Sequence, residues 1–201
     1  MPIEETWLID AVGQAIAGLG ERQLALDIGA NRGDWACELA LAFAKVIAVE
    51  PDDRNPLAQK AADGVEVVTA AAWKVDGFVT LYMRPSPDQN SLLETHPIGA
   101  GACAPAPAIE ERLVPCRTLD SIAPGGADFV KIDVEGVEAD ILSACSRDGN
   151  WSRTVFVVEC HNTYDAVEAE LTSLGKSVRR VPHPSGTAHP GHCWAIGLPT
   201  E

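Results

Sequence analysis

The stretch Leu24-Ala-Leu-Asp-Ile-Gly-Ala-Asn-Arg-Gly33 decides the fold class of this chain. Its first half is a short apolar run, which is typical of a buried β-strand, and the run meets a glycine at position 29. A second run of this kind, Val46-Ile-Ala-Val-Glu50, follows after a helical pattern. Alternation of such runs with helical patterns predicts βα units, and therefore a mostly parallel sheet.

The same alternation continues through most of the chain. Further strands are expected at 65–70, 78–83, 113–117, 128–133 and 155–159, and helices at 3–19, 34–44, 51–62, 137–145 and 164–174. Two last strands, at 178–181 and 193–198, flank a loop and predict an antiparallel hairpin at the C-terminus. The predicted fold is therefore α/β, with helices on both faces of a mostly parallel sheet. Ligands of such sheets bind beyond the carboxyl ends of the strands, where the strand order reverses.

The length of 201 residues predicts a single domain that spans residues 1–201. Residues 1–20 are expected to form its N-terminal helix. The connection from Arg84 to Glu111 is rich in Pro, Gly and Ala and is much longer than an ordinary loop. We interpret this insert as a lid that covers an acceptor molecule.

Composition and charge exclude several classes of protein. Hydrophobic residues make up 46% of the chain and charged residues 22%, which is ordinary for a globular domain. The net charge of −14 disfavours a nucleic-acid partner, because phosphate backbones bind basic faces and the best basic candidate is the pair Arg179-Arg180. No apolar stretch approaches the roughly 18 residues of a membrane span, so no membrane contact is expected.

Cysteine usage and the N-terminus predict a cytoplasmic location. The six cysteines form no C-x-x-C pair and are interpreted as reduced thiols. The first ten residues are acidic and do not resemble a secretory signal. A homodimer is compatible with these features.

The ends of the first two strands predict a nucleoside cofactor. The G-x-x-x-G spacing of Gly29 and Gly33 differs from the dinucleotide fingerprint, which disfavours a nicotinamide dehydrogenase. Asp27 would repel a phosphate and attract an ammonium group, and Glu50 is placed to accept hydrogen bonds from ribose hydroxyls. An amine-bearing nucleoside without phosphate describes S-adenosylmethionine. The alternative is that the glycines serve only close packing between helix and strand. The predicted cofactor-binding residues are Asp27, Gly29, Asn31, Gly33, Glu50, Pro51, Asp52 and Ala72.

The ends of two later strands predict a catalytic edge. Asp133, Glu159 and His161 are expected to converge there, because both strands should be neighbours in the sheet. Two carboxylates and an imidazole could hold Mg²⁺ or Mn²⁺, which would lower the pKa of an acceptor hydroxyl. His161 is also the first candidate for the general base, and Lys131 is the second. The alternative is that the carboxylates cap helices or contact the acceptor directly, with His161 in a solvated loop.

Two neighbouring features have plainer interpretations. Glu135 begins the turn before a helix, where helix capping is the plain alternative to a role at the catalytic edge. The stretch His189-Pro-Gly-His192-Cys193 is interpreted as a polar hairpin loop, although its histidines could bind a metal.

The chain resembles the FkbM family of class I S-adenosylmethionine-dependent methyltransferases from about residue 24 to 160. The residues that carry the resemblance are Leu26-Asp-Ile-Gly-Ala-Asn-Arg-Gly33, Ala48-Val-Glu-Pro-Asp52, Asn90-Ser91-Leu92, Thr118-Leu-Asp120, Lys131-Ile-Asp-Val-Glu-Gly-Val-Glu138 and Val158-Glu159. The resemblance implies a seven-stranded Rossmann-like sheet and methyl transfer to hydroxyls, often on sugars or natural-product scaffolds. The chain is short for the family, and its insert at 84–111 is unusually rich in Pro and Ala, so the acceptor does not follow from the resemblance.

The function predicted from the sequence is S-adenosylmethionine-dependent O-methylation of a small hydroxylated acceptor, a sugar or glycosylated metabolite, with assistance from a metal ion. N-methylation and O-methylation of a phenol are the alternatives among enzymes. A protein that binds S-adenosylmethionine without catalysis is the alternative from another class. The acidic and imidazole side chains at the expected catalytic edge favour an enzyme.

Overall fold

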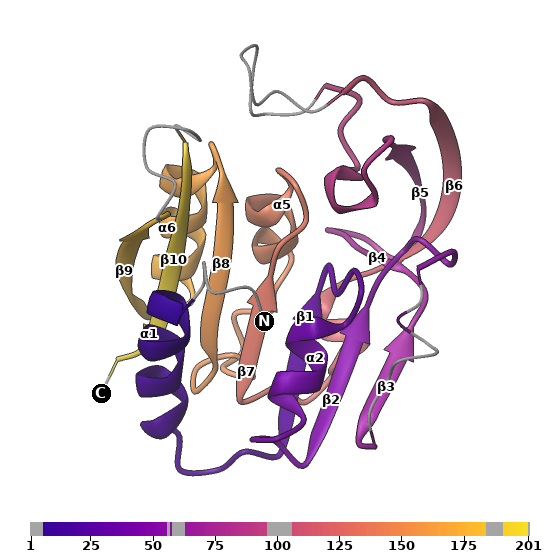
Figure 1. Ribbon diagram of the computed structural model, residues 1–201. Helices are drawn as coiled ribbons and strands as arrows, with labels where there is room; N and C mark the ends of the chain where they lie inside the picture. Colours follow the sequence, from indigo (N-terminus) through magenta and orange to yellow (C-terminus); the bar gives the residue numbers. More distant parts are fainter. Residues whose placement is uncertain (1–5, 56, 58–62, 96–105, 184–190, 201) are drawn as a thin grey trace.

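A seven-stranded β-sheet with helices on both faces forms the centre of the molecule, as the sequence predicts (Figure 1). The computed structural model describes residues 6–55, 57, 63–95, 106–183 and 191–200. In spatial order the strands are β3 (Val65–Val68), β2 (Lys45–Val49), β1 (Leu24–Ile28), β7 (Phe129–Ile132), β8 (Val155–His161), β10 (His192–Pro199) and β9 (Lys176–Pro182).

The first five strands in this order run parallel to one another. β10 is antiparallel to both of its neighbours, β8 and β9, so the predicted C-terminal hairpin is confirmed. The central strands are mostly apolar because both faces of the sheet are covered, with Asp27 and Lys131 as charged exceptions in β1 and β7. The chain leaves β1 in one direction, through β2 and β3, and later returns on its other side with β7 and β8. The strand order therefore reverses between β1 and β7.

The helices are shorter than predicted but lie within or close to the expected ranges. They are α1 (Thr6–Ala17), α2 (Asp34–Leu39), α4 (Leu119–Ile122), α5 (Glu138–Ser143) and α6 (Tyr164–Ser173). The chain turns after α2, and this turn lets Phe43 pack on Phe129 with ring centroids 5.7 Å apart. The sequence analysis did not predict α4. In the segment 51–62, where a turn and a helix were expected, residues 51–55 form bends and turns, and residues 56 and 58–62 lie outside the described residues.

Two hydrophobic cores cover the two faces of the sheet. One joins α1 and α2 to inward side chains such as Ala25, Val46 and Phe129. The other joins α4, α5 and α6 to Leu26 and Ile132, which alternate with the first set along their strands. In Figure 1, α1 and α2 lie in front of the sheet, and α5 and α6 lie behind it.

A second sheet of three strands stands beside the carboxyl ends of β2 and β3 (Figure 1). Its order is β4 (Ala71–Ala72), β6 (Glu110–Arg117) and β5 (Gly77–Met83). The single strand expected at 65–70 is therefore divided. The N–H of Ala70 donates to the carbonyl of Val68 at 3.0 Å, and the chain turns there from the large sheet into the small one. The strands expected at 78–83 and 113–117 are confirmed as β5 and β6 of this second sheet.

The first part of the predicted lid is tied to this second sheet. Arg84 is 3% exposed, and its guanidinium donates to four backbone carbonyls, those of Tyr82, Gln89, Leu93 and Glu94. A short 3₁₀ helix, η2 (Pro87–Gln89), lies within this loop. Residues 96–105 of the predicted lid lie outside the described residues.

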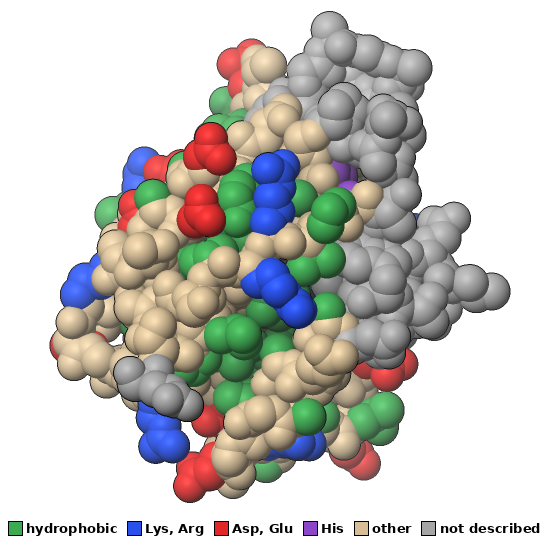
Figure 2. All heavy atoms as spheres, turned by 90° about the vertical axis from the view of Figure 1, so that its left-hand side faces the viewer, with side chains coloured by type: hydrophobic (Ala, Val, Ile, Leu, Met, Phe, Trp, Pro, Cys, Tyr) green, Lys and Arg blue, Asp and Glu red, His purple; other side chains and the backbone are tan. Residues whose placement is uncertain are grey.

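The surface along the β9 edge of the sheet carries mixed side chains (Figure 2). Arg179 and Arg180 are both exposed on β9. In Figure 2 the basic side chains of this face lie among hydrophobic and acidic ones. Within the described part of the chain, every helix is too short or too polar to cross a bilayer.

Candidate active site

The loops after β1 and β7 meet where the strand order reverses. Gly29 follows β1 with φ of +74°, and a Cβ added there would lie 1.8 Å from the backbone oxygen of Asp133. Only glycine fits this close approach. The glycine is needed for this contact between the two loops, and it also lines the cavity at the point where the two strand ends meet.

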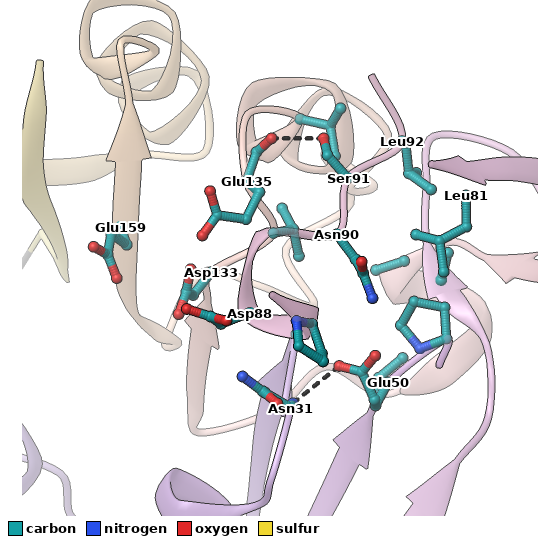
Figure 3. A pocket seen from close by; sticks show the side chains of 18 residues that line it. Asn31, Glu50, Leu81, Asp88, Asn90, Ser91, Leu92, Asp133, Glu135 and Glu159 are labelled. Atoms are coloured by element: carbon teal, nitrogen blue, oxygen red, sulfur yellow. Dashed lines mark hydrogen bonds between the residues drawn. The ribbon is translucent and has the colours of Figure 1, made fainter. Parts of the chain in front are cut away.

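A cavity of about 250 Å³ opens at this point, between the ends of the parallel strands and the second sheet. Glu50 lies at one end of it, and Asp133, Glu135 and Glu159 lie towards the other (Figure 3). Ala71, Ala72, Leu81 and Leu92 form apolar parts of the wall, together with Val49, Val134 and Val137.

The carboxylate of Glu50 is held by two backbone donors. The N–H of Asn31 donates to Oε2 and the N–H of Asp52 donates to Oε1, each at 2.9 Å. Burial raises the pKa of Glu50 to about 7, although these two hydrogen bonds act in the opposite direction. Each oxygen has a further lone pair, so the carboxylate can still accept hydrogen bonds from a pair of hydroxyls.

The other residues predicted near Glu50 have different environments. Asn31 and Pro51 line the cavity with it, and so does Ala72 at the end of β4. Asp52 does not line this cavity. Its buried carboxylate pairs with Arg54 at 2.9 Å, and this partner outweighs burial and lowers the pKa of Asp52.

Asp27 and Gly33 lie away from the cavity wall. Gly33 begins α2 with φ of +83°, and a Cβ there would lie 2.4 Å from Leu57, so the glycine serves packing. Asp27 is fully buried, and its Oδ1 lies 3.3 Å from Nζ of Lys131. The ammonium group of Lys131 thus lies beside Asp27, where the sequence analysis expected the amine of the cofactor.

Lys131 is a poor candidate for the general base. Its Nζ also donates to the carbonyl of Gly29 at 3.1 Å and lies 3.4 Å from Oδ2 of Asp133. Burial by itself would lower the pKa of Lys131, but Asp27 and Asp133 outweigh it and raise the pKa above that of a free lysine. The ammonium therefore keeps its proton and fixes the two loops instead.

His161 lies at the end of β8 and is 1% exposed, so it does not occupy a solvated loop. Its Nδ1 lies 2.7 Å from Oε1 of Glu138. Its Nε2 faces the acidic end of the cavity, 3.4 Å from Oε2 of Glu135 and 3.9 Å from Oδ1 of Asp133. Burial would lower the pKa of His161, but hydrogen bonds to Glu135 and Glu138 raise it well above the ordinary value.

Two groups of side chains have ligand atoms close enough to share one cation. The first comprises Asp133, Glu135 and His161, and the second comprises Glu159, His161 and His192. Among the described residues, His161 is common to both, whereas Asp133 and Glu159 fall in different groups. The predicted trio therefore does not form one ligand group: Glu135 takes the place of Glu159 in the first, and His192 takes the place of Asp133 in the second.

The carboxylates of this edge influence one another. Burial raises the pKa of Asp133, and Lys131 and His161 reduce this effect. Burial and the nearby charge of Asp133 raise the pKa of Glu159 well above its ordinary value. These two groups are therefore stronger proton acceptors than exposed carboxylates.

The motif Asn90-Ser91-Leu92 closes the cavity from the side of the predicted lid. Ser91 is buried, and its hydroxyl donates to the carbonyl of Glu135 at 2.7 Å (Figure 3). Asn90 accepts a hydrogen bond from the N–H of Arg84 and donates one to Asp52. The motif thus joins the loop at 84–95 to both ends of the site.

Comparison with protein families matches residues 27–178 to the methyltransferase FkbM domain. The chain belongs to the FkbM methyltransferase family. Comparison with curated proteins finds no match. Among solved structures, an FkbM methyltransferase from Methylobacillus flagellatus has a TM-score of 0.58 and 17% identity, over 87% of this chain and 43% of that protein. The chain therefore spans less than half the length of this FkbM protein.

Other solved methyltransferases share the fold. A precorrin-6y C5,15-methyltransferase from Geobacter metallireducens has a TM-score of 0.52 and 15% identity, over 100% of this chain and 93% of that one. A putative methyltransferase from Escherichia coli has a TM-score of 0.52 and 13% identity, over 100% and 89% of the two chains. At these identities the likeness concerns the fold of the FkbM domain and not its acceptor.

Three residues of the FkbM site were missed or misread from the sequence. Glu135 does not cap a helix but points into the cavity, from a turn with φ of +60° that no local pattern marks. Glu138 is fully buried beneath His161, although it reads as an ordinary acid in the first turn of α5. His192 begins β10 directly opposite His161, so it is not part of the loop. The register of the hairpin, which the sequence leaves open, decides this position.

The Asp of the Thr118-Leu-Asp120 motif has a structural role. Asp120 accepts hydrogen bonds from Nε1 of Trp151 at 2.6 Å and from the N–H of Ser146 at 2.9 Å. Trp151 is fully buried in the core. This motif therefore stabilises the domain from a place outside the cavity.

Proposed function

We propose that this FkbM chain transfers a methyl group from S-adenosylmethionine to a hydroxyl of a small acceptor, a sugar or a glycosylated metabolite. The observation that carries the proposal is the carboxylate of Glu50, held by two backbone donors at one end of the cavity. Two carboxylates that can accept a proton, those of Asp133 and Glu159, lie towards the other end. A cofactor between the two would have its nucleoside at Glu50 and its reacting group near Asp133.

The residues of the cavity fit such a cofactor. Glu50 can accept hydrogen bonds from the two hydroxyls of a ribose, and the neighbouring apolar wall of Val49, Ala72 and Leu81 suits an adenine ring. A cationic ligand is also favoured, because the described lining residues include five carboxylates and neither Lys nor Arg. S-adenosylmethionine supplies an electrophilic methyl group when it is bound.

The acceptor must lose a proton from its hydroxyl, and the chain has groups that can take it. Asp133 and Glu159 have raised pKa values, so each binds a proton more readily than an exposed carboxylate. Nε2 of His161 faces the same space and is the second acceptor once its own proton has left. A proton can pass from a bound acceptor hydroxyl to one of these side chains with little further movement, because they lie close together.

We also propose a divalent cation at this edge, as an aid to the ionisation of the acceptor. The donor set of His161 with carboxylate oxygens suits Mg²⁺ or Mn²⁺. The cation would be held by one of the two groups, either Asp133 and Glu135 with His161 or Glu159 and His192 with His161. A bound cation supplies positive charge that favours the ionised form of a hydroxyl.

The partner expected here is a small molecule. The polar groups of Asp88 and Glu135 line the cavity near Asp133 and can hydrogen-bond to a polyol (Figure 3). The net charge of −14 disfavours nucleic acid. We keep a cytoplasmic location and a possible homodimer as expectations.

The test is a methyl-transfer assay with labelled S-adenosylmethionine and a panel of hydroxylated, phenolic and amine acceptors. Calorimetry with S-adenosylhomocysteine runs in parallel, with Glu50→Gln as the binding variant. Binding followed by label in a sugar would support the proposal. Label only in amines or phenols would change the acceptor class. Binding without transfer to any acceptor would favour a non-catalytic protein, and no binding would refute the proposal.

A further inference from the structure

The most completely buried acid of the site does not line the cavity. Glu138 is 0% exposed and lies in the first turn of α5, beneath His161. Three donors surround its carboxylate. Oε1 accepts from the N–H of Gly136 at 2.8 Å and contacts Nδ1 of His161 at 2.7 Å, and Oε2 accepts from the hydroxyl of Thr163 at 2.7 Å.

This arrangement places a hydrogen on Nδ1 of His161, whether or not Nε2 also carries one. A carboxylate that already receives an N–H and an O–H is a hydrogen-bond acceptor and has no hydrogen to offer. Nδ1 must therefore be the donor in the contact with Glu138. The nitrogen left to act in the cavity is Nε2, which faces Glu135 and Asp133.

We propose that Glu138 is a positioning residue for methyl transfer, which holds the His161 ring through Nδ1 so that Nε2 acts at the acceptor. The inference rests on the proposed function, because it assumes that His161 works on the acceptor. It applies equally to His161 as a proton acceptor and as a cation ligand, since both roles use Nε2.

Other groups contact the imidazole in different ways. The ring of His192 meets His161 edge to face, with centroids 4.7 Å apart, and such a contact limits tilt but does not select a nitrogen. Glu135 and Asp133 both lie on the Nε2 side. Glu138 approaches from the Nδ1 side, at a hydrogen-bond distance of 2.7 Å.

The experiment compares four full-length variants. Glu138→Leu removes the acceptor, Glu138→Asp keeps the charge but shortens its reach, and Glu138→Gln keeps an acceptor oxygen at the same length. Asp140→Asn is the matched control, because Asp140 is an exposed acid of the same helix that pairs with Lys74. Each variant is measured for kcat, for KM and for the Kd of S-adenosylhomocysteine.

A second readout does not depend on activity. In protein labelled with ¹⁵N-histidine, a buried and hydrogen-bonded Nδ1–H gives a proton signal that exchanges slowly with water. The signal is assigned by its loss in His161→Gln. It should be present in the wild type, Glu138→Gln and Asp140→Asn, and absent in Glu138→Leu.

We expect kcat to fall by about 10- to 100-fold in Glu138→Leu and Glu138→Asp, with the Kd of S-adenosylhomocysteine almost unchanged, and to recover in part in Glu138→Gln. Full kcat in Glu138→Asp, or a protected Nδ1–H in folded Glu138→Leu, would overturn the inference. If the wild type shows the protected signal but methylates no acceptor, the positioning contact stands and the proposed function fails. If Glu138→Leu does not fold, Glu138→Asp and Glu138→Gln decide the matter.

Discussion

The backbone N–H of Asn31 donates a hydrogen bond of 2.9 Å to Oε2 of Glu50. The bond joins the loop after β1 to the end of β2, and Asn31 makes it from a left-handed conformation with φ of +45°. Asparagine tolerates this conformation better than most residues. The bond turns the carboxylate of Glu50 into the cavity and fixes it there before any ligand arrives (Figure 3).

Replacement of Glu50 by alanine should weaken the binding of S-adenosylhomocysteine. The change removes the acceptor of charge-assisted hydrogen bonds, which contribute about 1.5–3 kcal/mol, so Kd should rise by roughly 10- to 100-fold. Calorimetry measures the change. Asp53→Asn, an exposed acid nearby, is the control. Unchanged affinity in Glu50→Ala would show that the ribose does not bind here.

The affinity for S-adenosylhomocysteine should depend on pH through Glu50. Burial raises the pKa of this carboxyl to about 7 in the free protein. Hydroxyl donors bind best to the ionised form, so a ligand must displace a proton below this pH. Kd should therefore rise about tenfold for each pH unit below 7 and stay flat above about pH 8. Calorimetry should also detect proton release at pH 6, and Glu50→Gln should abolish both effects.

The strands were predictable because burial on both faces leaves a clear trace in the sequence. The runs at 24–28, 46–50 and 128–133 are mostly apolar, as is typical of parallel strands under two layers of helix, and their charged residues include Asp27 and Lys131. The start of the second sheet was not predictable in this way. The division at Ala70 depends on a turn made of small residues, and the sequence around it reads as one continuous strand.

The site was predictable as far as it follows from strand ends. Glu50, Asp133 and His161 were found because each directly ends a buried strand. Asp27 was misplaced because an internal partner, Lys131, lies on the neighbouring strand in register with it. Glu138 could not be recognised, because its role depends on the packing of α5 beneath β8.

Alanine at position 29 should strongly destabilise the fold. The new Cβ would meet the backbone of Asp133, and φ of +74° is unfavourable for alanine. We expect a loss of about 3 kcal/mol or more in the free energy of unfolding, which lowers Tm by roughly 6–12 °C. Thermal unfolding measures the shift. Gly125→Ala is the control, because a Cβ there meets nothing within 4 Å, and an equal shift in both variants would contradict the explanation.

Hydrogen exchange should divide the predicted lid at 84–111 into parts that behave differently. The guanidinium of Arg84 fixes residues 84–94, so their amides should exchange slowly even without ligand. We therefore no longer expect this first part of the insert to be mobile in the free protein. Addition of S-adenosylhomocysteine with an acceptor should slow exchange further across the insert. Arg84→Gln should raise the exchange rates at 84–94. Strong protection of the whole insert in the free protein, unchanged by ligands, would contradict its role as a lid.

Removal of divalent metal should abolish methyl transfer and leave cofactor binding intact. An alcohol has a pKa far above 7, and a cation can supply several kcal/mol towards its ionisation. Chelation should therefore stop turnover, and Mg²⁺ or Mn²⁺ should restore it, while calorimetry shows the same Kd for S-adenosylhomocysteine. Asp133→Ala should behave like the chelated enzyme. His161→Ala should keep some binding of Mn²⁺ and lose most of kcat.

Two further variants separate the possible ligand groups. Glu135→Gln removes a carboxylate from the group with Asp133, and Glu159→Gln removes one from the group with His192. Whichever change weakens Mn²⁺ binding more strongly, as measured by electron paramagnetic resonance, identifies the group that holds the ion. Asp165→Asn, an exposed acid in the first turn of α6, should leave Mn²⁺ binding unchanged. Full activity after exhaustive chelation would refute the metal, because the carboxylates would then bind the acceptor directly and His161 would take its proton alone.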